Sequence, residues 1–513
     1  MPAMTIMVQG TASHVGKSVL VAALCRIFKQ DGYRVAPFKS QNMALNSFVT
    51  RDGGEMGRAQ VVQAEAAGLD PHVDMNPVLL KPTGQASSQV IVLGRPVGNL
   101  SAQDYHQKYA ARVWDVICMA LERLRQDYDV IVIEGAGSPA EVNLQSTEIV
   151  NMRVARLAQA PVLLVADIDK GGALASVVGT LELISPEDRD RIGGIIINKF
   201  RGDVSLFQPA VDFLEKRTGK HVLGIVPYFQ GFRIQEEDTI PLDLHQPGKR
   251  HDHDGVEITV LYLPHISNFT DFDPLEDEPD VKLRYARLGE SLGRPDLIII
   301  PGSKNTIEDL VLLKQSGVAA EVKRLAAEGV PVVGVCGGFQ MLGRELRDPL
   351  GAESAVPRVA GLELLDIVTT FERDKITNQV EAQVLAGGFL GCDEGQDIRV
   401  QGYEIHMGRS ETAPSMMPAF KILARSGQEV VQSDGAVSSN GMVMGTYIHG
   451  IFDSDLFRRH VIDRLRLRKG LPRYHGTRVL TLWEQRQRDF DRLAAVVRGS
   501  LDMDRLYSML NRY

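Results

Sequence analysis

The chain has 513 residues, which exceeds the size that one hydrophobic core usually supports, so two or three domains are expected. Its composition, with 44% hydrophobic and 24% charged residues, is typical of a globular protein dissolved in water. A net charge of −8 gives no electrostatic reason to bind nucleic acid or an anionic membrane, and no apolar run approaches the roughly 20 residues that cross a bilayer.

Cysteine usage and the amino terminus both favour a cytoplasmic protein. The four cysteines, Cys25, Cys118, Cys336 and Cys392, are far apart and form no C-x-x-C pair. A disulfide framework or a zinc site is therefore not expected. The amino terminus runs directly into a strand pattern, with no basic segment and no cleavage site.

The first half of the sequence alternates short apolar runs with amphipathic segments. Six runs are typical of buried strands, at residues 5–9, 33–38, 129–133, 161–166, 194–198 and 223–226. Helical patterns cover residues 18–30, 109–125 and 148–159. This alternation predicts an α/β fold in which helices cover both faces of a parallel sheet.

The first predicted strand and the first predicted helix are joined by Gly-Thr-Ala-Ser-His-Val-Gly-Lys-Ser, the context that a phosphate-binding loop requires. Gly10, Thr11 and Gly16 belong to this loop, whose backbone N–H groups would hold phosphates. Lys17 would neutralise phosphate charge, and Ser18 would bind Mg²⁺. Five residues separate the two glycines, one more than in the common pattern. The alternative interpretation is a glycine turn that only starts a helix.

A magnesium ion bound by Ser18 needs further oxygen ligands. Glu134 closes the predicted strand at residues 129–133, so it would project at the carboxyl edge of the sheet, where ligands bind in open α/β folds. Asp52, in a glycine-rich turn, is the second candidate. The alternative interpretations are that Glu134 only caps the end of the strand and that Asp52 is only a turn residue.

A polar, turn-rich segment at residues 245–255 is expected to link two domains, and its histidines are more typical of a solvated connector than of a metal site. Strand patterns resume at residues 257–263, 296–301, 330–335 and 442–448. The sequence therefore predicts one domain at residues 1–244, a second at 256–457, and a helical extension at 458–513.

The sequence Gly-Val-Cys-Gly-Gly follows a predicted strand and is typical of a nucleophile elbow. Its glycines permit a tight turn that would expose the thiol of Cys336, and the helix that follows favours a thiolate. His449, at the end of another apolar strand, is the predicted base. The Gly337 N–H and a glycine turn at Gly302 would form an oxyanion hole. The alternatives are a buried core cysteine and a structural histidine.

Residues 334–343, Gly-Val-Cys-Gly-Gly-Phe-Gln-Met-Leu-Gly, resemble the elbow of class I glutamine amidotransferases, and the phosphate loop resembles that of dethiobiotin synthetase. This pairing resembles the group of cobyric acid synthases and cobyrinic acid a,c-diamide synthases. Five further segments resemble the cobyric acid synthase family (CobQ type), at residues 37–47, 134–141, 198–203, 263–273 and 402–408. The resemblance implies a phosphate-loop α/β domain followed by an amidotransferase-like α/β domain.

The resemblance also implies the activity of an ATP- and glutamine-dependent ligase. Such an enzyme amidates the b, d, e and g carboxylates of adenosylcobyrinic acid a,c-diamide through acyl phosphates, giving adenosylcobyric acid. ATP and Mg²⁺ would be the cofactors, and L-glutamine and a corrinoid polycarboxylate the substrates. Asn198 and Lys199 would contact ATP. The candidates for corrinoid contacts lie in or close after the family-like segment at residues 37–47, and are Lys39, Gln41, Asn42, Asn46 and Arg51.

One departure from the wider amidotransferase pattern concerns the base. The usual pattern ends in His-x-Glu, but Gly450 and Ile451 follow His449. The carboxylate that would orient the imidazole is therefore predicted to be missing. A glutaminase of modest rate is expected, or one that is assembled only when the synthetase half is loaded. Glu404 and His406 are the candidate substitutes.

Two alternative functions are open. One is a ligase of the cobyrinic acid a,c-diamide synthase type, which Phe-Lys-Ser-Gln-Asn-Met at residues 38–43 disfavours. The other is a phosphate-loop ATPase switch whose inactive amidotransferase-like domain binds a partner, which the intact elbow disfavours. No nucleic-acid or membrane partner is expected, and a homo-oligomer is left open.

Overall fold

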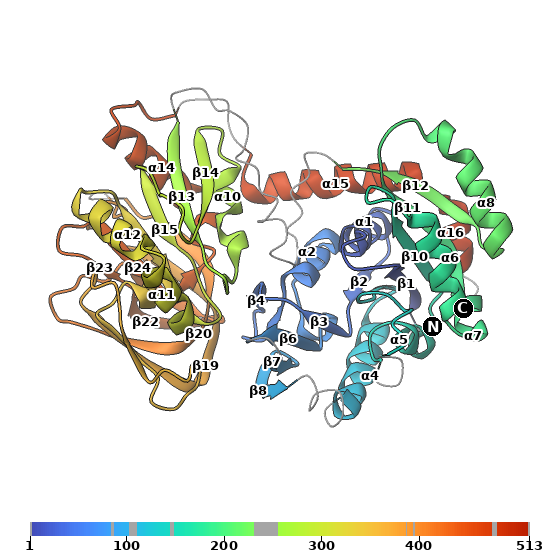
Figure 1. The fold of residues 1–513 in the computed structure, drawn as a ribbon, viewed down its shortest axis with the longest axis horizontal. Coiled ribbons are helices and arrows are strands. Elements are labelled where there is room, and N and C mark those ends of the chain that lie inside the picture. Colours follow the sequence, from blue (N-terminus) through green and yellow to red (C-terminus); the bar gives the residue numbers. More distant parts are fainter. Residues whose placement is uncertain are drawn as a thin grey trace. The chain divides into compact units, whose positions relative to one another are not determined.

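The computed structural model describes residues 3–83, 87–101, 110–143, 148–229, 255–385, 387–392, 396–474 and 480–510. The chain forms two compact units (Figure 1). The first comprises Met1–Ala44, Glu55–Gln235 and Trp483–Tyr513, and the second comprises Leu45–Gly54 and Glu236–Leu482. Each unit is therefore built from separate stretches of the sequence. The predicted linker at residues 245–255 lies, apart from Gly255, outside the described residues.

The first unit is centred on a six-stranded sheet in the order β12-β11-β10-β1-β9-β2, with every neighbouring pair parallel. The strands are β1 (Met4–Gly10), β2 (Val35–Phe38), β9 (Val130–Glu134), β10 (Val162–Asp167), β11 (Ile192–Phe200) and β12 (Val222–Pro227). Their long buried runs are typical of a sheet that is covered on both faces. All six strands predicted for this half are confirmed.

Helices connect these strands. They are α1 (Lys17–Gln30), α2 (Arg58–Ala67), α4 (Ala110–Asp127), α5 (Met152–Ala158), α6 (Ala173–Leu183), α7 (Pro186–Arg191) and α8 (Gln208–Thr218). Helix α5 is shorter than the predicted span of residues 148–159. The reason is that the Glu148 carboxylate accepts hydrogen bonds from the backbone N–H groups of Asn151 and Arg153, so Glu148 lies before the helix.

A second sheet of the first unit was not predicted. It contains β3 (Gln41–Met43), β6 (Val78–Pro82), β7 (Ser87–Val92) and β8 (Arg95–Ser101), in that order. The short strand β5 (Glu55–Gly57) directly precedes α2. None of the helices in the described ranges is both long and apolar enough to span a membrane.

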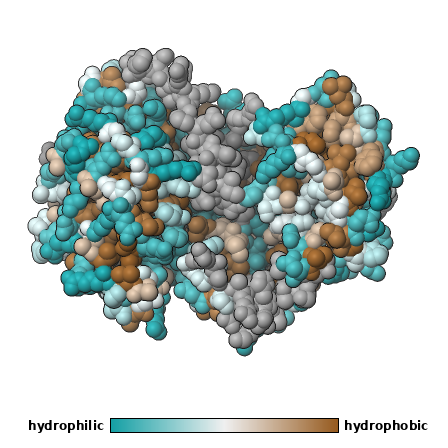
Figure 2. Space-filling model, viewed as in Figure 1, coloured by the Kyte–Doolittle hydropathy of each residue, from teal (hydrophilic) through white to brown (hydrophobic). Residues whose placement is uncertain are grey.

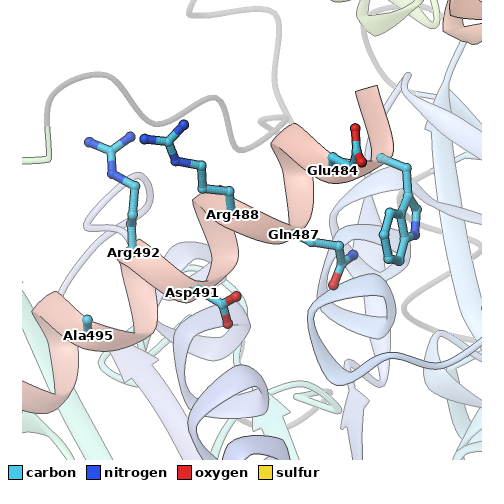
Figure 3. A pocket seen from close by; sticks show the side chains of 7 residues that line it. Glu484, Gln487, Arg488, Asp491, Arg492 and Ala495 are labelled. Carbon is cyan, nitrogen blue, oxygen red and sulfur yellow. The ribbon is translucent and has the colours of Figure 1, made fainter. Parts of the chain in front are cut away.

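The last two helices, α15 (Leu482–Ser500) and α16 (Met503–Leu510), pack against α1 of the first unit. Leu493 and Val497 of α15 share a buried cluster with the apolar residues of α1. Asp491 accepts a hydrogen bond from Arg26 of α1 at 2.8 Å. Asp491 and six other α15 residues line a cavity of about 510 Å³ (Figure 3). The predicted extension at residues 458–513 is therefore divided, because residues 458–482 belong to the second unit and only the last two helices contribute to the core of the first.

The second unit contains a mainly parallel sheet in the order β14-β13-β15-β16-β24-β23. The strands are β13 (Val256–Tyr262), β14 (Val281–Arg287), β15 (Leu297–Ile300), β16 (Val332–Val335), β23 (Ala436–Val437) and β24 (Val443–Thr446). The predicted strand at residues 442–448 is divided into β24 and β25 (Ile448–His449). Side chains interrupt the ladder there, because Asp434 binds the Tyr447 N–H and Thr446 binds the Ile448 N–H.

The other large sheet of this unit has seven strands and was not predicted. Its members are β17 (Glu345–Arg347), β18 (Arg358–Ala360), β19 (Ile367–Val384), β20 (Arg399–Thr412), β21 (Phe420–Arg425), β22 (Gln428–Asp434) and β25. Strand β20 pairs with β25, so that Tyr403 lies opposite His449. This pairing connects the sheet directly to the predicted base.

Short helices complete the second unit. They are η5 (Phe269–Phe272), α10 (Asp273–Glu276), α11 (Thr306–Gln315), α12 (Val318–Ala327), α13 (Gly337–Met341), η6 (Ile451–Asp453) and α14 (Asp455–Arg468). On the face drawn in Figure 2, apolar side chains lie among polar ones on both units. Among the large apolar side chains that the structure describes, Leu206 and Val431 are the most exposed, at 81% and 82%. Exposed apolar residues of this kind are usual on globular proteins.

Candidate active sites

The phosphate loop joins β1 to α1 in the first unit. Gly16, immediately before the helix, has a left-handed backbone with φ +96°. A Cβ atom at this position would lie 2.2 Å from Nδ2 of Asn198. A Cβ at Gly10 would lie 2.5 Å from Val15 and 3.1 Å from Nζ of Lys17. Both positions therefore require glycine, because the loop closes tightly around the start of the helix.

Lys17 spans this loop with its ammonium group. Its Nζ donates to the backbone oxygens of Ala12 at 3.1 Å and Gly137 at 3.2 Å. At the other end of the loop, the Thr11 N–H donates to Val165 at 2.9 Å. The lysine side chain is 92% buried, so its charge is held inside the loop, where it would neutralise a bound phosphate.

Glu134 ends β9 beside the loop and is 1% exposed. Its carboxylate accepts hydrogen bonds from Ser18 at 2.8 Å and Gln63 at 2.5 Å, and it forms an ion pair with Lys39 at 3.1 Å. Burial by itself would raise the pKa of Glu134, but Lys39 and these hydrogen bonds outweigh it and lower the pKa. Glu134 is therefore an anion beside Ser18, as a magnesium ligand must be.

Asn198 and Lys199 follow the predicted strand that becomes β11, and both contact the phosphate loop. Asn198 Nδ2 donates to Val15 at 2.8 Å, whereas its buried Oδ1 has no hydrogen-bond partner within the described ranges. Lys199 Nζ donates to His14 at 2.6 Å and pairs with Asp167 at 2.9 Å. A buried acceptor without a partner is the kind of group that a bound ligand satisfies.

The predicted corrinoid contacts and the second metal candidate are divided between the units. Lys39, Gln41 and Asn42 lie in the first unit, where Asn42 donates to Gln60 at 2.9 Å. Asn46, Arg51 and Asp52 lie in the second unit. Asp52 is exposed there and accepts a hydrogen bond from Thr50. The first unit by itself therefore brings together Ser18 and Glu134, but not Asp52.

Clusters of metal ligands give no further candidate. Among the residues that the structure describes, no group of three or more His, Cys, Asp or Glu side chains could hold a metal ion. Magnesium is usually held by one or two protein carboxylates together with substrate phosphates. Ser18 and Glu134 fit that mode of binding.

Cys336 lies on a strained turn between β16 and α13 in the second unit. Its backbone is left-handed, with φ +52°, which is uncommon for a residue other than glycine. A Cβ at Gly338 would lie 2.0 Å from the Ile300 oxygen, so the turn fits only because glycine follows. The Cys336 thiol is 7% exposed and lies 3.6 Å from the Ile405 oxygen. This geometry is that of a nucleophile elbow.

His449 is 1% exposed and bonded to a carboxylate from a distant part of the sequence. Its Nδ1 lies 2.6 Å from Oδ2 of Asp271 in η5. Burial would lower the pKa of His449, but Asp271 and the Cys336 sulfur raise it to about 10. Nε2 is buried without a hydrogen-bond partner in the described part of the chain. The prediction that the orienting carboxylate is missing is therefore wrong, because Asp271 supplies it.

Glu404 and His406, the predicted substitutes, are engaged elsewhere. Glu404 receives two hydrogen bonds from Arg425, at 2.8 and 2.9 Å. His406 Nδ1 lies 2.7 Å from the Gly408 oxygen, and its ring stacks on Tyr447 at 3.8 Å. Burial lowers the pKa of His406 to about 3. Neither side chain makes a hydrogen bond to His449.

The two glycines predicted for an oxyanion hole lie in two neighbouring turns, Gly337 in the elbow and Gly302 in the turn that contacts it. A Cβ at Gly337 would lie 2.9 Å from the backbone nitrogen of Ser303. A Cβ at Gly302 would lie 3.1 Å from Cε1 of His449. The structure thus brings the glycine turn, the elbow and the histidine together.

A cavity of about 740 Å³ adjoins the elbow. Phe339 of α13 lines it together with Glu404 and His406. These two residues flank Ile405, whose backbone oxygen contacts the Cys336 thiol. Residues of both charge signs line it, the acidic Glu372 and Asp374 and the basic Arg409 and Arg425. An amino acid, which carries an ammonium and a carboxylate group, suits such a mixed lining.

Two residues of these sites were not predicted from the sequence. Asp271 falls in the family-like segment at residues 263–273, but nothing in its local pattern connects it to His449. Gln63 lies in the middle of α2, where a polar residue is ordinary. Its complete burial, which only the packing reveals, indicates its role at Glu134.

Comparison with known proteins matches both units to described families. Residues 257–457 match the CobB/CobQ-like glutamine amidotransferase domain, and residues 6–242 match the CobQ/CobB/MinD/ParA nucleotide binding domain. A glutamine amidotransferase structure from Thermotoga maritima is 18% identical, covers 50% of this chain and 99% of its own, and has a TM-score of 0.28.

Full-length relatives are much more similar. A cobyric acid synthase of Pelotomaculum thermopropionicum is 57% identical over 99% of this chain and 97% of its own. A cobyric acid synthase of Moorella thermoacetica is 56% identical with the same coverage. With a nucleotide-binding domain and an amidotransferase domain in one chain, this protein belongs to the cobyric acid synthase family of glutamine-dependent ligases.

Proposed function

We propose that the chain uses ATP and glutamine to amidate the b, d, e and g carboxylates of adenosylcobyrinic acid a,c-diamide, giving adenosylcobyric acid. The observation that carries this proposal is the arrangement of Cys336, His449 and Asp271 in a chain that also holds a phosphate loop. A thiol elbow alone would serve many hydrolases. Its pairing with a nucleotide site, in a chain of this family, points to amide synthesis.

At the thiol site, the raised pKa of His449 favours an imidazolium beside a Cys336 thiolate, and the thiolate attacks the carboxamide carbon of glutamine. The N–H groups of Gly337 and Gly302 bind the oxyanion that forms. The carbon–nitrogen bond then breaks, and ammonia leaves with the proton from His449. Water hydrolyses the remaining thioester to glutamate, with His449 again moving the proton. The cavity beside Phe339 holds the ammonium and carboxylate groups of glutamine.

At the nucleotide site, a corrinoid carboxylate attacks the γ-phosphorus of ATP, and ADP leaves. This step is needed because the oxide of a free carboxylate is too poor a leaving group to be displaced by ammonia. Ammonia then attacks the acyl carbon, the carbon–oxygen bond breaks, phosphate leaves, and the nitrogen loses a proton. Lys17 neutralises charge on the transferred group. The unsatisfied Oδ1 of Asn198 would accept a hydrogen bond from a bound nucleotide.

Ser18 and Glu134 would hold Mg²⁺, which supplies charge neutralisation on the phosphates. Their 2.8 Å contact and the anionic state of Glu134 support this role. Gln41, Asn42 and Arg51 remain the candidates for contacts with the corrinoid. Lys39, which is paired with Glu134, would hold that carboxylate in place and attract the anionic substrate.

The test compares Cys336→Ala and Lys17→Ala with glutamine or ammonium chloride as the nitrogen donor. Cys336→Ala is expected to lose product formation from glutamine by more than a hundredfold, while ammonium still supports ATP-consuming amidation. Lys17→Ala is expected to lose both. Cys118→Ala is the matched control, since Cys118 is a half-buried helix residue outside both sites. Normal glutamine use by Cys336→Ala would refute the thiol assignment.

A further inference from the structure

Residues 45–54 separate two strands of the first unit in the sequence but belong to the second unit. They lie between β3 and β5 and contain the short strand β4 (Ser47–Val49). Two side chains of β19 hold the segment from one side. Thr377 donates to the Gly53 oxygen at 2.8 Å, and Gln379 donates to the Val49 oxygen. The segment is therefore an integral part of the amidotransferase unit.

Asn46 connects this segment to the element that carries Asp271. Its Oδ1 accepts the backbone N–H of Phe269, the first residue of η5, at 3.2 Å. In return, the side chain of Asn268 accepts the backbone N–H of Ser47 at 3.0 Å. Asn46 is 1% exposed. This reciprocal pair of hydrogen bonds fixes the start of the single turn on which Asp271 lies.

Phe48 is connected to His449 through the ring of Tyr403. Its ring packs against Tyr403 with a centroid distance of 5.1 Å. Tyr403 stacks on the His449 imidazole, with a centroid distance of 5.2 Å and ring planes 15° apart. The same small apolar cluster contains Ile405, whose backbone oxygen contacts the Cys336 thiol. One short segment therefore supports both the carboxylate and the aromatic ring that hold the imidazole.

We propose that residues 45–54 position the glutaminase histidine, with Asn46 fixing the turn of Asp271 and Phe48 backing Tyr403. This inference rests on the proposed function, because it requires His449 to act on the thiol. It gives Asn46 a role other than the corrinoid contact expected from the sequence. Asn46 is 99% buried and its Oδ1 is bonded to Phe269, so only Nδ2, a buried donor without a hydrogen-bond partner within the described ranges, is left for a substrate.

The experiment measures product formation from glutamine and from ammonium chloride for Asn46→Ala, Phe48→Leu and Phe48→Tyr. Asn46→Ala and Phe48→Leu are expected to lower kcat for glutamine tenfold or more with little change in KM, because imidazole orientation is lost while the substrate cavity is kept. Ammonium-driven synthesis is expected to stay within about twofold. Phe48→Tyr keeps the ring and should restore glutamine use.

Asn440→Ala is the matched control. Asn440 Oδ1 also accepts a backbone N–H, from Met442 at 3.0 Å, in a turn of the same unit. Asn440→Ala should leave product formation from glutamine and from ammonium chloride unchanged. Thermal unfolding of each variant shows whether it is folded, and Phe48→Leu keeps the test valid if Asn46→Ala is not.

Two outcomes would overturn the proposal. If Asn46→Ala lowered product formation equally with glutamine and with ammonium, and raised the KM for the corrinoid, Asn46 would be a substrate-binding residue instead. Unchanged kcat for glutamine in Asn46→Ala and Phe48→Leu would show that the segment does not position His449. Neither outcome touches the proposed function itself, which depends on the separate result for Cys336→Ala.

Discussion

Asp271 and His449 are 178 residues apart in the sequence, yet their Oδ2 and Nδ1 atoms lie 2.6 Å apart. Both side chains are buried. A carboxylate in this position holds the imidazole in one tautomer and stabilises its protonated form. The wider amidotransferase pattern takes this carboxylate from the second position after the histidine. Here it comes from a turn that precedes the nucleophile in the chain.

Asp271→Asn is expected to lower kcat for glutamine by about a thousandfold, since loss of the equivalent carboxylate elsewhere costs about ten-thousandfold. Ammonium-driven synthesis should be retained. The same assay on Glu215→Gln provides the control, because Glu215 lies 3.2 Å from a ring nitrogen of His221 outside either site. Glutamine use that survives in Asp271→Asn would show that another group orients His449.

Gly16→Ala is expected to abolish ATP-dependent synthesis with either nitrogen donor. The added Cβ would lie 2.2 Å from Asn198 Nδ2. Either the phosphate loop or the Asn198 side chain would therefore have to move. Gly219→Ala is the matched control, with a similar left-handed backbone but no atom within 4 Å of the added Cβ. It should cost only about 1 kcal/mol of stability. Equal ATP affinity in the two variants, measured by calorimetry, would contradict this account.

Glu134→Gln should lower the free energy of unfolding of the first unit by about 3 kcal/mol, because it removes the anion that forms a buried ion pair with Lys39. The double variant Glu134→Gln/Lys39→Met removes both charges and should recover most of that loss. It should not recover ATP consumption, since the magnesium ligand is gone. Chemical denaturation and an ADP-release assay separate the two effects. Recovery of ATP consumption would exclude Glu134 as a ligand.

Asp434→Asn is expected to stabilise the second unit at neutral and alkaline pH. Burial, with Glu404 adding to it, raises the pKa of Asp434 to about 7, so the folded protein holds this proton more tightly than the unfolded chain. The native contribution therefore falls as pH rises from about 4 to about 7. The variant should match the wild type near pH 4 and exceed it by on the order of 4 kcal/mol above pH 7. A pH-independent difference in thermal unfolding would contradict this.

Local patterns were sufficient to predict the parts of both sites that lie at strand ends. Gly16 and Cys336 each follow a buried strand and precede a helix, so their surroundings are set by a few neighbouring residues. The positions of Glu134 and His449 followed from the same rule for strand ends. The hydrophobic periodicity and the glycine spacing in these parts of the sequence are explained by a buried strand that is followed by a tight turn and a helix.

The remainder depends on packing between distant segments. Asp271 lies on a four-residue 3₁₀ helix, which has no periodicity to detect, and its partner is far away in sequence. Strand β19 was missed because exposed polar residues at positions 372–374 interrupt its alternating pattern. The assignment of residues 45–54 to the second unit depends on contacts with Thr377 and Tyr403 that no local pattern encodes.

The interleaving of the two units limits how this enzyme could be divided. A gene cut within residues 245–255 would leave residues 45–54 on one polypeptide and the thiol on the other. The same cut would separate α15 and α16 from the helix they cover. Neither polypeptide would contain a complete folding unit. The two halves would therefore have to be made together and exchange segments in order to fold and function. A freestanding glutaminase of this type would first need a replacement for Asn46 and Phe48.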